Sequence, residues 1–316
     1  MNRAPQPCAS ISDALGNTPL VSLERLGLNK LTAWAKLEQF NPGGSAKDRT
    51  AREMVKVADI APGTMVIESS SGNLGLALSR EAVLGGWDFH CVVDPRANKA
   101  TVNYMKAMGA TVHVLTEPDP ETGDWLAARR KKVAELLKDN PDAINLDQYS
   151  NTAAFHAHAQ GTMREIHEQL GHAPDFLLVA VSTTGTIGGC QKYVRQHGLG
   201  TQLVAVDAEG SVLFGGERGT RHLPGFGAGV VPELSSQVRP DRVMRIADRA
   251  SISAARNLAR TTAIVPGASG GAVIAALLQL DRELTEPAEA VVVIHDSGNF
   301  YLDTIYNDEW VRENVK

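Results

Sequence analysis

The sequence predicts an α/β fold in which parallel sheets carry helices on both faces. Three features indicate this fold. Short runs rich in Val, Leu and Ile are apolar throughout instead of alternating, as in strands buried on both sides. Stretches with a helical period stand between these runs. Glycines follow several of the helical stretches, where C-caps belong, and such strand–helix alternation is typical of parallel sheets.

The expected strands and helices alternate along most of the chain. The strands are Met65–Ile67, Phe89–Val93, Thr111–Leu115, Phe176–Val181, Leu203–Val206 and Ala290–Ile294. The helices are Ala46–Ala58, Leu74–Leu84, Lys99–Met108, Trp125–Lys138, Ala154–Leu170 and Ile187–His197. The expected caps are Gly85-Gly86, Gly109 and Gly198. The segment from Gly210 to Pro240 is rich in glycine and shows neither a strand-like apolar run nor a helical period, so it is expected to be a long loop.

Length and composition indicate a soluble globular protein of one or two domains. The 316 residues are 43% hydrophobic and 21% charged, which is enough for a packed core. The apolar runs are far shorter than the ~18 residues of a membrane span, and the first ten residues contain no signal-peptide core. A net charge of −5 argues against nucleic-acid binding. We therefore expect a cytoplasmic protein without membrane or nucleic-acid partners.

A lysine stands in the first turn of the first expected helix. Ser45 is placed to cap this helix, and Asp48 follows three residues later as in a capping box. Lys47 therefore lies where the helix dipole disfavours a cation, and a lowered amine pKa favours a neutral, nucleophilic lysine. The alternative is a solvated surface lysine, which is the commoner situation.

Two polar turns follow expected strands and precede expected helices. Glu68–Gly75 brings hydroxyls and amides to a helix N-terminus, where an anion binds, although a simple capped turn fits it equally well. Ser182–Gly189 offers three hydroxyls and successive backbone N–H groups, as a phosphate monoester requires. This second turn is neither a P-loop nor a GxGxxG motif, and a phosphate cup is favoured over a plain turn. The small residues of Gly267–Gly271 at the head of an apolar helix indicate close packing.

Motifs for metal chemistry are absent from the sequence. His156 and His158 are two residues apart and cannot share a helix face, and there is no HExxH motif. The three cysteines have no CxxC spacing, so neither a disulfide framework nor a cysteine zinc site is expected. The basic run Arg129–Lys132 is typical of a solvated helix face, although one member could turn inward toward an anion.

A reactive lysine and a phosphate cup without a metal motif are what pyridoxal-phosphate chemistry needs. The chain resembles the cysteine synthase family of fold type II pyridoxal-phosphate enzymes in five motifs that keep the family's order. They are GNTPL (16–20), NPGGSAKDR (41–49), SSGNLG (70–75), STTGT (182–186) and GASGG (267–271). The resemblance implies a tryptophan synthase β-like fold of two three-layer α/β/α domains. Residues 1–40 plus 151–316 would form the large cofactor domain, and residues 41–150 a smaller, mobile substrate domain. It also implies a homodimer.

The resemblance further implies roles for single residues. Lys47 would be the Schiff-base lysine, Asn73 would hydrogen-bond the phenolic oxygen of pyridoxal 5′-phosphate, and Ser269 would face its pyridine nitrogen. The cofactor phosphate would be held by Ser182, Thr183, Thr184, Gly185 and Thr186. The substrate α-carboxylate would be bound by Gln148 together with Ser70, Ser71 and Gly72 of the Ser70–Leu74 loop. The loop that starts at Gly225 would close over bound substrate.

A serine at the pyridine nitrogen has a chemical consequence. A neutral hydroxyl cannot stabilise a pyridinium as a carboxylate would, so we expect an unprotonated nitrogen and a weaker electron sink. This suits β-elimination better than long-lived carbanions. Lys47, released when substrate displaces it, is placed to be the general base, and a second nucleophile then adds to give a β-substituted alanine.

The sequence also departs from the usual cysteine synthase motifs. SSGNLG replaces TSGNTG and puts Leu74 where a hydroxyl is usual, STTGT replaces GTGGT, and the C-terminal segment reads HDSGNFYLD (295–303). These features resemble a branch of the family that makes N-(2-amino-2-carboxyethyl)-L-glutamate from O-phospho-L-serine and L-glutamate, a source of 2,3-diaminopropionate for siderophores. In that reaction Arg129, Tyr149 and Ser182 would handle the extra anionic groups.

Three alternatives stay open from the sequence. A true cysteine synthase would use O-acetylserine and sulfide, so the donor substrate distinguishes it from the branch that makes N-(2-amino-2-carboxyethyl)-L-glutamate. A non-catalytic ligand-binding protein on the same scaffold is disfavoured because Lys47 is retained. A nucleotide-binding Rossmann protein lacks its glycine fingerprint.

Overall fold

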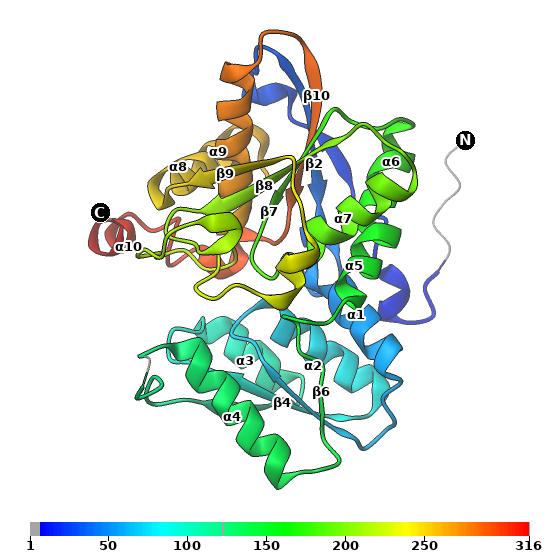
Figure 1. Cartoon of the computed structure of the whole chain (residues 1–316), viewed down its shortest axis with the longest axis vertical. Helices are drawn as coiled ribbons and strands as arrows, with labels where there is room; N and C mark the ends of the chain where they lie inside the picture. Colours follow the sequence, from blue (N-terminus) through cyan, green and yellow to red (C-terminus); the bar gives the residue numbers. More distant parts are fainter. Residues whose placement is uncertain (1–6, 122, 316) are drawn as a thin grey trace.

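In the computed structural model, residues 7–121 and 123–315 are described, and they form two sheets in two lobes (Figure 1). The larger sheet has the strand order β1-β2-β10-β7-β8-β9, in which only β1 runs antiparallel to its neighbour. Its strands are β1 (Leu20–Ser22), β2 (Leu31–Leu37), β7 (Phe176–Ala180), β8 (Gln202–Ala208), β9 (Arg242–Ile246) and β10 (Ala288–Ile294). The smaller sheet is parallel throughout, with the order β5-β4-β3-β6. Its strands are β3 (Met65–Ser69), β4 (Asp88–Val93), β5 (Thr111–Val114) and β6 (Ile144–Asn145).

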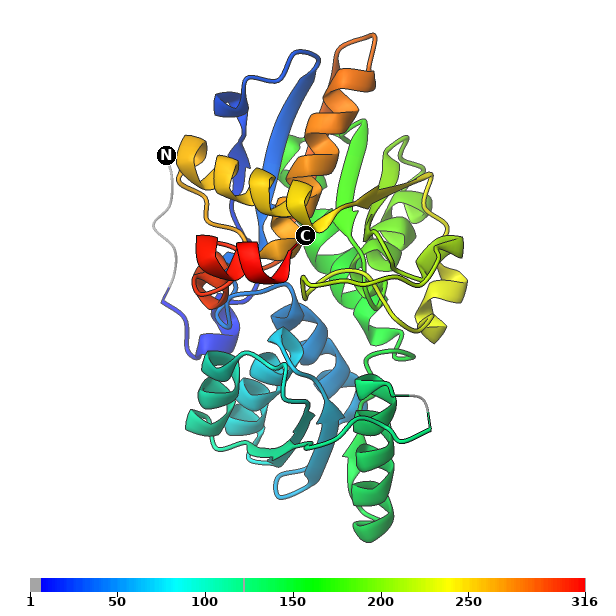
Figure 2. The ribbon, with the colours of Figure 1, turned by 90° about the vertical axis from the view of Figure 1, so that its left-hand side faces the viewer.

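Helices cover both sheets, and one helix lies between the lobes. This helix, α1 (Lys47–Ala58), packs against α2 of the smaller lobe and α5 of the larger lobe (Figure 1). The smaller lobe contains α2 (Asn73–Gly85), α3 (Lys99–Ala107) and α4 (Trp125–Asp139). The larger lobe contains α5 (Ala153–His158), the π-helix η4 (Ala159–Met163), α6 (Arg164–Leu170), α7 (Gly185–Gln196), α8 (Asp248–Thr262), α9 (Ala268–Glu283) and α10 (Asp308–Asn314). The view in Figure 2 shows α8 and α9 on one side of the larger lobe and α10 near the lobe boundary.

Short 3-10 helices occur mainly in the connecting segments. They are η1 (Ile11–Ala14), η2 (Glu24–Leu26), η3 (Glu38–Phe40), η5 (Leu213–Gly215), η6 (Glu233–Gln237) and η7 (Gly298–Tyr301). The segment from Gly210 to Pro240 contains only η5 and η6, in agreement with the long loop that the sequence predicts.

Two separate apolar cores cover the two faces of the larger sheet. Val292 and Ile294 of β10 belong to the core that includes Val273 of α9, whereas Val293 belongs to the core that includes Phe155 of α5. Successive side chains of a strand point to opposite faces, so a strand between two helix layers is apolar at every position. This packing explains the uninterrupted apolar runs in the sequence.

All the strands and helices expected from the sequence are present, with ends shifted by a few residues. One prediction needs correction, because the expected helix Ala154–Leu170 is interrupted by the π-helix Ala159–Met163. The sequence also failed to predict β1, β2, β6, β9, α8 and α10. β1 and β6 are very short, and β2 contains the charged Lys36, which interrupts its apolar run. No helix in the described part of the chain is both long and apolar enough to cross a membrane.

Candidate active site

A cavity of about 270 Å³ lies where loops that follow the strands meet the first turns of several helices. Its wall comes from the segments after β3, β7 and β10 and from the starts of α1, α2, α7 and α9. Ligands of α/β proteins bind at this end of parallel strands, facing helix N-termini. Every residue singled out by the resemblance lines this one cavity: Lys47, Ser70, Ser71, Gly72, Asn73, Arg129, Gln148, Tyr149, Ser182, Thr183, Thr184, Gly185, Thr186, Gly225 and Ser269.

Lys47 is the first residue of α1, and the residues around it depart from the predicted capping box. The Ser45 hydroxyl accepts a hydrogen bond from the Lys47 N–H at 3.2 Å. The Asp48 carboxylate accepts one from the Gly43 N–H at 2.7 Å, because the chain turns back sharply before the helix. Burial lowers the pKa of Lys47 to about 8, while the nearby Glu68 opposes this shift. The amine is thus easier to deprotonate, as the sequence predicts, and burial is the cause.

Glu68 is a buried acid beside Lys47 to which the sequence analysis gave no role. One carboxylate oxygen accepts the Ser69 N–H at 2.9 Å, and the other is buried without a hydrogen-bond partner among the described residues. Burial raises the pKa of Glu68 to about 7. The lysine therefore has, buried behind the cavity wall, a neighbouring carboxyl group that gains and loses its proton near neutral pH.

The predicted phosphate cup leads into α7. Thr184 caps the helix with φ of +68°, a left-handed backbone conformation that is unusual for a non-glycine residue. Its hydroxyl is buried without a partner among the described residues. The Ser182 hydroxyl donates to the Gly227 carbonyl at 3.1 Å, and the Thr186 hydroxyl lies 3.3 Å from Nε2 of His158. A free hydroxyl next to the unpaired N–H groups of a helix start is suited to an anion.

Asn73 binds a buried carboxylate, Asp296, for which the sequence predicted no role. Nδ2 of Asn73 and the hydroxyl of Tyr301 donate to Oδ2 of Asp296 at 2.8 and 2.7 Å. Burial raises the pKa of Asp296 above its ordinary value, and the hydrogen bonds from Tyr301 and Asn73 offset only part of this shift.

His295 is a second cavity residue without a predicted role. Both of its ring nitrogens are buried and have no hydrogen-bond partner among the described residues. Burial lowers the pKa of His295 to about 4, so the ring is neutral. One signal could have indicated both His295 and Asp296, because they are polar residues placed directly after the buried strand β10.

Arg129 is the member of the basic run on α4 that turns inward. Its side chain is only 12% exposed, its Nη1 donates to the Ser71 hydroxyl at 2.7 Å, and its Nε lies 3.4 Å from the Asp94 carboxylate. The next residue, Arg130, places its guanidinium 4.8 Å from the ring centroid of Tyr149. Gln148 donates through Nε2 to the Ser69 carbonyl at 3.1 Å. These contacts bring a cation to the part of the cavity formed by the Ser70–Leu74 loop.

The residues present fit a small cofactor that carries a phosphate and a carbonyl. A phosphate would supply the acceptor that the Thr184 hydroxyl and the first turn of α7 lack. A carbonyl carbon would meet the amine of Lys47, whose pKa of about 8 leaves part of it neutral and nucleophilic. Among the residues that the structure describes, no three His, Cys, Asp or Glu side chains are grouped to hold a metal ion.

Comparison with known proteins agrees with this chemistry. A family model described as pyridoxal-phosphate dependent enzyme matches residues 11–296, and the chain belongs to this family. It is an enzyme that depends on pyridoxal phosphate, so the predicted fold class and cofactor are confirmed.

Three named proteins are similar to this chain over nearly its whole length. The N-(2-amino-2-carboxyethyl)-L-glutamate synthase of Ralstonia nicotianae is 40% identical over 307 residues, 96% of this chain and 90% of the relative. The O-acetylserine dependent cystathionine β-synthase of Helicobacter pylori has a solved structure with a TM-score of 0.87 and 28% identity, covering 96% of this chain and 100% of that one. O-ureido-L-serine synthase gives a TM-score of 0.87 and 26% identity, covering 97% and 100%.

Proposed function

We propose that the protein catalyses a β-replacement in which O-phospho-L-serine and L-glutamate give N-(2-amino-2-carboxyethyl)-L-glutamate and phosphate. The product would supply 2,3-diaminopropionate for siderophore biosynthesis. The observation that carries this proposal is Arg129, a largely buried cation on the cavity wall beside Ser71. Phosphate and the two carboxylates of L-glutamate present more negative charge to such a cation than acetate and sulfide do. The 40% identity to the synthase from Ralstonia nicotianae supports the same reaction.

Lys47 carries the cofactor and then acts as the general base. When bound, pyridoxal phosphate supplies an electron sink for the bonds that break at the substrate Cα and Cβ. Ser182 through Thr186 hold its phosphate, Asn73 its phenolic oxygen and Ser269 its pyridine nitrogen. Lys47 accepts the substrate α-proton at Nζ, for which its pKa of about 8 is well suited.

The substrates bind at the opposite wall. Gln148 and the loop from Ser70 to Gly72 take the α-carboxylate at the N-terminus of α2, where backbone N–H groups favour an anion. Arg129, together with Tyr149 and Ser182, faces the donor phosphate or the glutamate carboxylates. The loop that starts at Gly225 excludes water by closing over the bound substrate.

The same proposal covers the organisation of the enzyme. Residues 41–150 form a smaller domain that moves against residues 1–40 plus 151–316, supported by the division of the strands into two separate sheets. The enzyme is a cytoplasmic homodimer. Exposed apolar side chains such as Ile11 and Phe40, at 50% and 59% exposure, support a subunit interface.

The test is to give the purified enzyme each donor with each nucleophile and to identify the amino-acid product by mass. We expect a glutamate adduct from O-phospho-L-serine. Cysteine from O-acetylserine and sulfide, with phosphoserine inert and no glutamate adduct, would identify a cysteine synthase instead.

A further inference from the structure

The basic run on α4 contains two neighbouring arginines that point in different directions. Successive side chains of an α-helix are about 100° apart around its axis, so adjacent residues face different surroundings. Arg129 turns inward to the cavity wall, with a side chain that is 12% exposed. Arg130 is exposed, and its guanidinium lies 4.8 Å from the ring centroid of Tyr149. The site therefore has an inner and an outer cation.

The inner cation is fixed beside the place proposed for the donor. Arg129 donates through Nη1 to the hydroxyl of Ser71 at 2.7 Å, and Ser71 belongs to the loop proposed to bind the substrate α-carboxylate. Its Nε lies 3.4 Å from the carboxylate of Asp94, a residue that is 3% exposed. Part of its charge is thus already balanced within the protein, and its position suits the phosphate of a bound O-phospho-L-serine.

The outer cation has no such partner. Within residues 7–121 and 123–315, no carboxylate forms an ion pair with Arg130 and no group accepts a hydrogen bond from its side chain. Further along the same helix, Lys132 does have a partner, the Glu135 carboxylate at 3.2 Å. The five N–H donors of the Arg130 guanidinium are therefore left for solvent or for an anionic group.

Tyr149 places this guanidinium at the edge of the cavity. Tyr149 lines the cavity, and its backbone is held on both sides. Its N–H donates to the Asp147 carboxylate at 3.2 Å, and its carbonyl accepts the Leu234 N–H at 3.0 Å. A guanidinium within about 6 Å of an aromatic ring centroid is attracted to the ring face. Arg130 is thus oriented by a cavity residue and lies one aromatic ring away from the cavity.

We propose that Arg130 binds the side-chain carboxylate of the second substrate and so selects an acidic amino acid as the nucleophile. This inference rests on the proposed function, in which L-glutamate is that nucleophile. The amino group of glutamate must enter the cavity to reach the carbon derived from the donor. Its side-chain carboxylate is separated from Cα by two methylene groups and can extend toward the edge of the cavity. There Arg130 contributes a charge-assisted hydrogen bond and takes no part in bond formation.

The experiment separates the two steps in wild-type and Arg130→Gln enzyme loaded with pyridoxal phosphate. O-Phospho-L-serine alone measures the first step, followed as phosphate release in a single turnover. L-Glutamate is then varied to obtain KM and kcat. We expect the first step to be unchanged and the KM for L-glutamate to rise about tenfold at similar kcat, because only binding is lost. An unchanged KM would overturn the proposal.

L-Glutamine separates the charge of Arg130 from its packing on Tyr149. This amino acid has the length of L-glutamate but a neutral side chain. We expect the wild type to favour L-glutamate over L-glutamine about tenfold in kcat/KM, and Arg130→Gln to use both equally. A preference for L-glutamate that survives in Arg130→Gln would show that another group binds the carboxylate, and the proposal would fail.

Lys131→Gln is the matched control, because it removes one positive charge from the next residue of α4, which is also exposed and outside the cavity wall. Its KM for L-glutamate is expected to equal that of the wild type. An equal rise of KM in Lys131→Gln and Arg130→Gln would show a general effect of positive charge, which contradicts the proposal. A wild-type enzyme that releases phosphate from O-phospho-L-serine but forms no glutamate adduct would refute the proposed function itself. That failure is distinct from an adduct whose KM does not depend on Arg130.

Discussion

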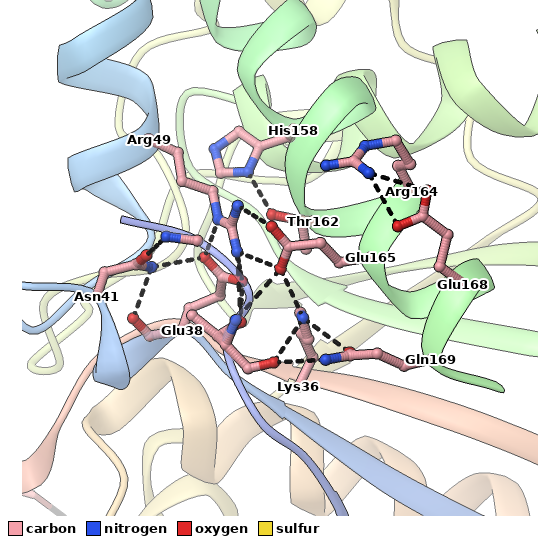
Figure 3. Close-up of polar contacts among 12 residues, drawn as sticks. Lys36, Glu38, Asn41, Arg49, His158, Thr162, Arg164, Glu165, Glu168 and Gln169 are labelled. Atoms are coloured by element: carbon pink, nitrogen blue, oxygen red, sulfur yellow. Dashed lines mark hydrogen bonds and ion pairs between the residues drawn. The ribbon is translucent and has the colours of Figure 1, made fainter. Parts of the chain in front are cut away.

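Two residues apart at the start of α1, Lys47 faces the cavity and Arg49 enters a buried network of charges. In the network, Arg49 binds Glu38 and Glu165 at 2.7 Å, and Lys36 binds Glu165 at 2.8 Å (Figure 3). Thr18 and Asn41 complete it, with hydrogen bonds to Glu38. The cavity shows the opposite state, since both ring nitrogens of His295, the Thr184 hydroxyl and Oδ1 of Asp296 are buried without partners among the described residues.

The charges of the network satisfy one another, whereas the cavity atoms lack partners. A buried polar atom without a partner costs about 1–3 kcal/mol, so a molecule bound in the cavity would recover that cost where it supplies the missing partner. The network needs no ligand. It also explains the GNTPL motif, because the Thr18 N–H donates to Glu165 and the Thr18 carbonyl accepts from Lys36. A side chain at Gly16 would come within 3.0 Å of Glu165.

The largest effect is expected at the residue on the cavity side. Lys47→Ala should abolish turnover and the visible absorption of lysine-bound cofactor, while the free energy of unfolding of the cofactor-free protein changes by about 1 kcal/mol at most. Absorption spectra, product assays and urea unfolding measure these quantities. A wild-type protein that stays colourless with added pyridoxal phosphate would contradict the role of Lys47.

Breaking the network should affect stability instead. Arg49→Met leaves the buried Glu38 without its cation while Glu165 keeps Lys36, so we expect a loss of about 3–5 kcal/mol in the free energy of unfolding. Arg164→Met is the matched control, because its pair with Glu168 is exposed and should contribute about 0–1 kcal/mol (Figure 3). Equal losses of unfolding free energy in the two variants would show that the buried ion pairs stabilise the fold no more than the exposed pair does.

The two regions should respond to pH with opposite sign. Burial would raise the pKa of Glu165, but Arg49 and Lys36 lower it to about 2. Its contribution to stability is therefore complete above the unfolded pKa near 4.5 and is lost as the pH falls toward 2. Glu68, with a pKa raised to about 7, favours the fold when protonated, so stability is lost as the pH rises from about 4.5 to 7.

Glu68→Gln tests this difference. The variant should lack the decline of stability between about pH 4.5 and 7 and should gain about 3 kcal/mol over the cofactor-free wild type at pH 8. Urea unfolding at several pH values gives the measurement. An unchanged pH profile would mean that Glu68 is not protonated in the folded protein.

The smallest effect is expected from the cation on the cavity wall. Arg129→Ala removes a charge-assisted hydrogen bond of roughly 1.5–3 kcal/mol, or about one to two decades in the rate with O-phospho-L-serine. Any residual reaction of O-acetylserine should change far less. Rate constants for the two donors provide the comparison, and an equal loss for both would show that Arg129 only supports Ser71.

Sequence alone determined the features that depend on neighbouring residues. Apolar runs and helical periods come from local patterns, so the strands around Val291–Val293 and helices such as α2 were predicted close to their final bounds. The motifs that surround the cavity were predicted for the same reason. The motifs at 41–49, 70–75 and 182–186 lie between a strand and a helix, and parallel strands bring such turns to one edge of a sheet, whereas the motif at 267–271 lies between α8 and α9.

Only the tertiary structure decided which distant side chains pair. Arg49 and Glu165 are 116 residues apart, and Asn73 and Asp296 are 223 apart, so no local period could indicate either contact. The π-helix within the expected helix Ala154–Leu170 also has a distant neighbour. A side chain at its Gly161 would come within 2.7 Å of the Arg49 guanidinium, so glycine fits there because of a residue 112 positions earlier in the sequence. Burial in three dimensions set the proton affinities of the site as well, because desolvation depends on everything that surrounds a group.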